Sequence, residues 1–115
     1  MELKLNVYNH GKVVKTYVAS DFTLTTGLCE DALKLVDFDK LLASDMDQKR
    51  LGIEVLRLLS NGLDKFRPFF IDMFEGMTEE EFRNTSIKEL AKVVIEVVNY
   101  SVNELNTITG NNEKN

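Results

Sequence analysis

Apolar and polar residues alternate at the start of the chain. Leu3, Leu5 and Val7 are separated by single polar residues, which predicts a strand with one buried face. Residues 9–12 (NHGK) are typical of a turn, and residues 12–18 are rich in β-branched side chains, so a second strand should follow. The two strands should form a hairpin. Because a lone hairpin is only marginally stable in water, it should pack on helices or pair with another sheet.

Helical spacing dominates the rest of the chain. Apolar residues three and four positions apart predict a short amphipathic helix over residues 27–36, capped by Thr25 or Thr26. Residues 37–44 are either irregular or one further helical turn. The pattern then becomes strongly periodic again, which indicates that longer helices follow.

The first long helix should begin at a cap formed by Ser44 or Asp45. It should end at Asn61 and Gly62, a pair that is typical of a helix C-terminus. Another helix should start directly afterwards with Pro68 in its first turn, where the missing N–H of proline costs least.

Residues 66–82, which we call the elbow, hold five of the seven Phe residues, two of the four Met and the only Pro. Gly76 should end the incoming helix, because glycine adopts a left-handed conformation at little steric cost. Thr78 and Glu81 form a capping box, so a new helix should start at once. The predicted core stripe consists of Leu63, which lies one turn before the elbow, and of Phe66, Phe70, Met73 and Phe74 within it.

Two further apolar residues of the elbow do not fit that stripe. Phe69 and Ile71 lie about 100° to either side of Phe70 on a helix. One core stripe cannot hold both, so at least one of them should lie at the edge of the fold. The elbow is therefore either core throughout or in part a docking surface for another protein.

The last helix should begin after Ser86, which forms a second capping box with Glu89, and should run to about Asn106. Its apolar arc is wide, which predicts burial on more than one side. This helix is either the centre of the domain or also a contact between subunits of an oligomer. Residues 109–115 (TGNNEKN) should form a disordered polar tail.

These elements predict an α+β fold, with an N-terminal β-hairpin followed by four to five mostly antiparallel helices, and predominantly helical overall. The 115 residues suffice for one domain, which should span residues 1–108. The net charge of −5 argues against binding to nucleic acid or to an anionic membrane surface. The single cysteine excludes an internal disulfide and fits a reducing cytoplasm, and no apolar run is long enough to span a membrane.

Candidate chemistry is sparse. The only His and the only Cys, His10 and Cys29, fit a solvated turn and a small buried side chain better than a catalytic pair. The acidic run 79–81 fits the first turn of a helix, where the dipole favours carboxylates, better than a cation site. No phosphate-binding or hydrolase motif is present. We therefore expect no catalytic, cofactor-binding or metal-binding residues, and a hydrolase or transferase would need a site built from carboxylates alone.

One local group of basic residues is either a solvated helix face or a surface that binds something acidic. It consists of Lys49, Arg50, Arg57, Lys65 and Arg67. By elimination, an interaction protein is expected rather than an enzyme.

A hairpin followed by helices and by PFFIDMFEGMTEEEFRNTSIKELAKVVIEVVNY, residues 68–100, resembles the tail assembly chaperones of long-tailed, siphovirus-type bacteriophages of Gram-positive bacteria. The matching order is an apolar helix ending at Met73 and Phe74, then residues 75–82 (EGMTEEEF), then a helix rich in Val and Ile. The resemblance covers roughly residues 1–108.

The resemblance implies a non-enzymatic protein that binds the tape measure protein during assembly of the tail tube, with the tail tube protein as a further candidate partner and a homo-oligomer left open. It implies the host bacterial cytoplasm as the location and absence from the mature virion. The candidate partner-binding residues are Phe69, Ile71, Met77, Phe82, Val93 and Val97. The alternative is a small phage or bacterial regulatory protein that binds DNA or a host factor.

Overall fold

The computed structural model describes residues 2–20, 24–37 and 47–114, with only the backbone described for residues 104–114. An N-terminal antiparallel hairpin of β1 (Glu2–Asn9) and β2 (Lys12–Ser20) precedes the helices. Within the described ranges, the helices are α1 (Thr26–Leu35), α3 (Gln48–Met73), α4 (Glu79–Arg83) and α5 (Ile87–Lys114). The predicted α+β, predominantly helical fold is confirmed.

The hairpin turns at His10 and Gly11, whose φ angles are 53° and 79°. Two successive positive φ values match the right-handed twist of the flanking strands, and glycine takes the second of them without strain. Leu3 and Leu5 are fully buried on the inner face, as the alternation predicts. Tyr17 from β2 completes this face, and the side chains together pack the hairpin onto the helices.

The N-terminus of α1 is capped as predicted, because the Thr25 hydroxyl accepts a hydrogen bond from the Leu28 backbone N–H at 3.2 Å. The N-terminus of α3 differs from the prediction. The helix begins at Gln48, and the Asp47 carboxylate caps it by accepting from the Arg50 N–H at 2.9 Å. The predicted caps at positions 44 and 45 lie outside the described residues.

The two predicted helices on either side of Gly62 meet at a kink within α3. Gly62 has non-helical angles, φ −149° and ψ 45°, so helical geometry breaks there as predicted and resumes directly afterwards. Pro68 consequently lies inside α3 and not in a first turn, which corrects the prediction. The bend also changes the direction of the second half, and Leu63, predicted as core, is 36% exposed.

The elbow follows the prediction closely. Gly76 has a φ of 90°, and both hydrogen bonds of the Thr78–Glu81 capping box are present. The helix that the box starts, α4, is only five residues long. The following α5 begins at Ile87 as expected, but the Glu89 carboxylate bonds to the hairpin and not back to its own helix.

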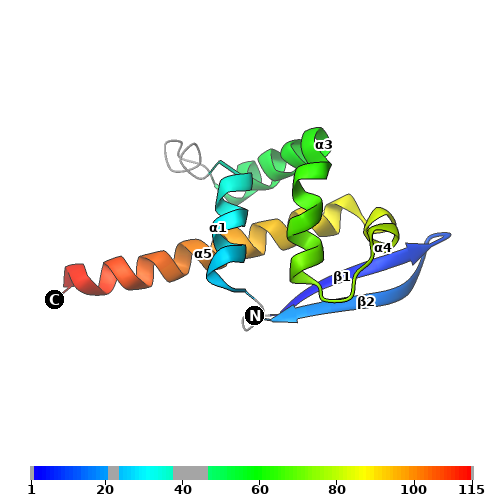
Figure 1. The fold of residues 1–115 in the computed structure, drawn as a ribbon. Helices are drawn as coiled ribbons and strands as arrows, with labels where there is room; N and C mark the ends of the chain where they lie inside the picture. Colours follow the sequence, from blue (N-terminus) through cyan, green and yellow to red (C-terminus); the bar gives the residue numbers. More distant parts are fainter. Residues whose placement is uncertain (1, 21–23, 38–46, 115) are drawn as a thin grey trace.

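The last helix is the centre of the fold (Figure 1). It contacts α1, α3 and β1, and Val94 and Val97 are fully buried, so its wide apolar arc serves the core of the single chain. The backbone of α5 continues to Lys114, through most of the segment 109–115 that the sequence predicts to be disordered. In Figure 1 this end of α5 projects beyond the other elements.

Candidate partner-binding surface

Burial separates the six predicted partner-binding residues into two groups. Ile71 is half-buried and lies at the edge of the fold. The other five are at most 5% exposed and pack against their own chain, namely Phe69, Met77, Phe82, Val93 and Val97. The kink in α3 and the short α4 let one core accommodate more of the elbow than a straight stripe would allow. A partner cannot reach these five side chains in this conformation, so the candidate surface has to be sought elsewhere.

Aromatic packing accounts for much of the burial in the elbow. The rings of Phe69 and Phe70 meet edge to face with centroids 5.3 Å apart, and those of Phe70 and Phe82 are 5.8 Å apart. The Arg67 guanidinium lies 5.9 Å from the centroid of the Phe82 ring and donates to Asp64 at 2.7 Å. The elbow is thus predominantly core, with Ile71 at its margin.

On the described surface, large apolar side chains are nevertheless exposed in two groups and at Ile87, which stands alone at the start of α5 with 39% exposure. One group, on β2, consists of Val13, Val14 and Val18, each at least half exposed. The other, on α3, consists of Ile53, Leu56 and Leu63, with Ile53 60% exposed. Exposed apolar residues that lie next to one another are candidates for a surface that another molecule covers.

The N-terminal half of α3 carries the exposed group that is most clearly organised. Ile53 has four helical neighbours at three- and four-residue spacing, and three of them, Lys49, Arg50 and Arg57, are cations. The fourth is Leu56. These five residues form what we call the α3 outer face, because all of them are exposed.

The opposite side of the same half-helix is anchored in the core. Leu51, Val55 and Leu59 are buried there. Paired hydrogen bonds between the side-chain amides of Gln48 and Asn99, at 3.4 and 3.2 Å, tie the start of α3 to α5. The core contacts fix the rotation of α3 about its own axis and so hold the outer face toward solvent.

The charge on α3 has the opposite sign to that of the rest of the chain. Five cations and three carboxylates give the helix a charge of +2, whereas the whole chain carries −5, so the remainder carries −7. Arg57 is partly neutralised by Glu54, whose two carboxylate oxygens lie 2.6 and 2.8 Å from Nη2. The α3 outer face is therefore a basic and apolar region on an acidic molecule.

Val13 and Val18 of β2 pair with Tyr8 and Lys4 of β1, and Val14 lies at the irregularity in the register next to Val13. On the β1 side, the edge of the hairpin is covered, because Asn84 accepts from the Tyr8 N–H at 2.9 Å and Glu89 from the Asn6 N–H at 3.0 Å. The Tyr8 hydroxyl also donates to Glu89, and this hydrogen bond raises the pKa of Tyr8 above its ordinary value. These contacts attach β1 to the start of α5.

The elbow is attached to β2 through Glu81. The Tyr17 hydroxyl lies 2.6 Å from the Glu81 carboxylate, which also accepts from the Thr78 N–H at 3.0 Å and pairs with Lys15 at 3.4 Å. The Tyr17 hydrogen bond, followed by that of Thr78, lowers the pKa of Glu81 to about 2. This carboxylate is committed to holding the elbow against the hairpin, while Glu79 and Glu80 face solvent.

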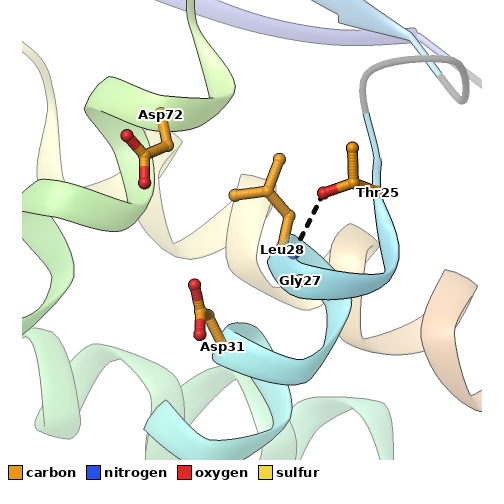
Figure 2. A pocket seen from close by; sticks show the side chains of 5 residues that line it. All are labelled: Thr25, Gly27, Leu28, Asp31 and Asp72. Carbon is orange, nitrogen blue, oxygen red and sulfur yellow. Dashed lines mark hydrogen bonds between the residues drawn. The ribbon is translucent and has the colours of Figure 1, made fainter.

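A hollow of about 390 Å³ lies between the start of α1 and the end of α3, lined by Thr25, Gly27, Leu28, Asp31 and Asp72. Figure 2 shows the carboxylates of Asp31 and Asp72 on the side of the hollow that faces α3, with Leu28 between them and Thr25. Two carboxylates are fewer than a metal site ordinarily requires. No three His, Cys, Asp or Glu side chains within the described ranges are grouped so as to hold a metal ion.

His10 and Cys29 do not come together, and the sequence had favoured separate roles for them over a catalytic pair. His10 is exposed in the hairpin turn, and Cys29 is half-buried on α1, where it packs against the core. The two elements are well separated in Figure 1.

Comparison of the chain with protein-family models, with curated proteins and with solved structures gave no match. None of the helices in the described part of the chain combines the length and hydropathy that a bilayer crossing requires.

For the basic residues of the α3 outer face, the sequence left open a solvated helix face or a surface that binds something acidic, but Ile53 and Leu56 were not among the predicted partner-binding residues. A signal for it exists in the sequence, because Ile53 and Leu56 interrupt the polar stripe formed by Arg50, Glu54 and Arg57. Apolar residues on the solvent side of an amphipathic helix indicate a surface that could contact a partner.

Proposed function

We propose that this chain is a non-enzymatic tail assembly chaperone of a long-tailed bacteriophage, which binds the tape measure protein while the tail tube is assembled. It would act in the host bacterial cytoplasm and be absent from the finished particle. The resemblance of residues 68–100 to that family supports the proposal. The observation that carries it is the α3 outer face, an apolar surface with an ordered ring of cations on one side of a described helix.

A binding role also fits the way the molecule is built. The core is continuous from the hairpin to α5, so the α3 outer face is presented by a folded scaffold. A net charge of −5 keeps a protein with exposed apolar residues in solution by mutual repulsion. An assembly chaperone needs both an exposed apolar binding surface and a stably folded domain that carries it.

The direct test is co-expression with the tape measure protein encoded in the same genome, followed by co-purification. Ile53→Asp should abolish co-purification, because a carboxylate replaces the apolar centre of the α3 outer face. Val14→Asp is the matched control, since Val14 is equally exposed at 60% but lies on the hairpin. Both variants should melt within a few degrees of the wild type, as surface substitutions usually do.

Three outcomes would count against the proposal. The wild-type chain would fail to co-purify with the tape measure protein, or Val14→Asp alone would abolish binding, or neither variant would have an effect. Salt-sensitive binding of the wild type to DNA in a gel shift would instead favour the regulatory alternative. A tail tube gene upstream and a very long open reading frame downstream would support the chaperone role independently.

A further inference from the structure

We infer that the α3 outer face binds an amphipathic helix whose apolar stripe is flanked by acidic residues. This inference rests on the proposed function for the source of that helix, the tape measure protein. The arrangement of cations and apolar side chains on α3 indicates which residues the partner helix must carry.

The spacing of the exposed apolar residues indicates a helical partner. Positions 53, 56 and 60, all in the half of α3 before the kink at Gly62, follow the 3-4 spacing of a helix–helix seam, and they hold Ile, Leu and Ser. All three side chains are exposed. Such a row packs into the groove between side chains of a second helix laid alongside it.

The seam is short, which limits the affinity. Eight residues of helix, 53–60, span about 12 Å, and the kink at Gly62 ends the straight part of the helix. An interface of this size belongs to the weak, transient class of protein contacts, with affinities in the micromolar range. A chaperone that must release its client requires an interaction of this strength.

Charge determines which helix fits. Ile53 is surrounded by three cations, Lys49, Arg50 and Arg57. When a partner helix lays its apolar stripe on Ile53 and Leu56, the residues that flank this stripe on the partner lie against the three cations. The cations of the α3 outer face attract acidic flanking residues on the partner helix and repel basic ones. This electrostatic effect sets the orientation of the partner helix and its rate of association with the chain. A second copy of this chain is disfavoured as the occupant, because two α3 outer faces would bring like charges together.

The experiment uses two synthetic helical peptides with the same leucine and isoleucine stripe, flanked by Glu in one and by Lys in the other. Binding of the full chain to each labelled peptide is followed by fluorescence anisotropy. At about 0.1 M salt the Glu-flanked peptide should bind at least tenfold more tightly than the Lys-flanked one. The preference should shrink at about 1 M salt, because the screening length falls from about 10 Å to about 3 Å.

Variants test the assignment to α3. Lys49→Glu combined with Arg50→Glu should reverse the preference between the peptides, and Ile53→Asp should abolish binding of both. Lys4→Glu combined with Lys12→Glu is the matched control, since it changes the net charge equally but on the hairpin, and it should leave the preference intact. Far-UV circular dichroism establishes that each variant is folded.

The inference is overturned if neither peptide binds, if the two bind equally, or if the hairpin control reverses the preference as strongly as the α3 pair. It is also overturned if the wild type binds phosphatidylserine vesicles and neither peptide, because the α3 outer face would then serve a membrane surface. If the peptide preferences hold but the tape measure protein does not co-purify, the proposed function fails while this surface assignment stands.

Discussion

Replacing Phe70 with alanine tests the packing of the elbow more directly than any other single substitution. Phe70 is fully buried and its ring lies between those of Phe69 and Phe82, at centroid distances of 5.3 and 5.8 Å. The alanine variant should lose about 3–5 kcal/mol of unfolding free energy, because the side-chain burial is lost and a cavity remains. The neighbouring Ile71 is half-buried, so Ile71→Ala should cost less than about 2 kcal/mol.

The size of this loss is large compared with the total stability. A chain of 115 residues should have an unfolding free energy of about 6–17 kcal/mol, from typical values per residue. Phe70→Ala should therefore remove a substantial fraction of it and lower the melting temperature by roughly 10–25 °C. The two ring contacts place the expected loss in the upper part of the range, because aromatic pairs contribute beyond their buried area.

Urea unfolding followed by far-UV circular dichroism measures both variants under the same conditions. The dependence of the free energy on urea should be similar in both, so that the midpoints report stability alone. Equal losses for Phe70→Ala and Ile71→Ala would refute the assignment of core and edge. A loss below about 1.5 kcal/mol for Phe70→Ala would show that the three rings do not pack as described.

Three further predictions concern other parts of the chain. Gly76→Ala should lower the free energy of unfolding by about 1–2 kcal/mol because Gly76 has a φ of 90°. Gly52→Ala should raise it by about 0.5–1 kcal/mol, because Gly52 lies inside α3 and the new Cβ would be 3.8 Å from the nearest side-chain atom. Equal denaturation midpoints for the two variants would contradict this prediction. Because folding lowers the pKa of Glu81 to about 2, its contribution to stability is present above the ordinary pKa of 4.5 and is lost as the pH falls toward 2. Glu81→Gln should therefore weaken the pH dependence of the urea midpoint between pH 5 and pH 2. An unchanged dependence would refute the role of Tyr17 and Thr78. A chelator should leave the melting temperature of the wild type unchanged, and a drop of several degrees would point to a bound metal.

Local sequence signals predicted the elements that depend on local chemistry. The alternation of Leu3, Leu5 and Val7 identified the buried face of β1, and Thr25 and Thr78 were recognised as helix caps. A cap or a strand face is decided by residues within a few positions of each other, so the pattern is sufficient. The same reasoning identified Gly62 as a break in helical geometry.

The consequences of that break were not readable from the pattern. The direction that the chain takes after Gly62 depends on what the second half of α3 packs against, and here Phe66, Phe69 and Phe70 join one core with α4 and α5. The bend removed Leu63 from the predicted core stripe and brought Phe69 into the core. The burial of five of the six predicted partner-binding residues follows from this arrangement.

The fold class, the hairpin, most helix starts and the basic character of α3 could all be predicted from local patterns in the chain. Which apolar residues remain exposed could not be predicted in this way, because burial depends on contacts between segments distant in the chain. The Glu89 carboxylate illustrates this, since the sequence assigns it to a capping box with Ser86, yet it bonds to Asn6, 83 residues away. Ile53 illustrates the same point at the surface, since it remains exposed because the core contacts of Leu51 and Val55 fix the opposite face of α3 inward.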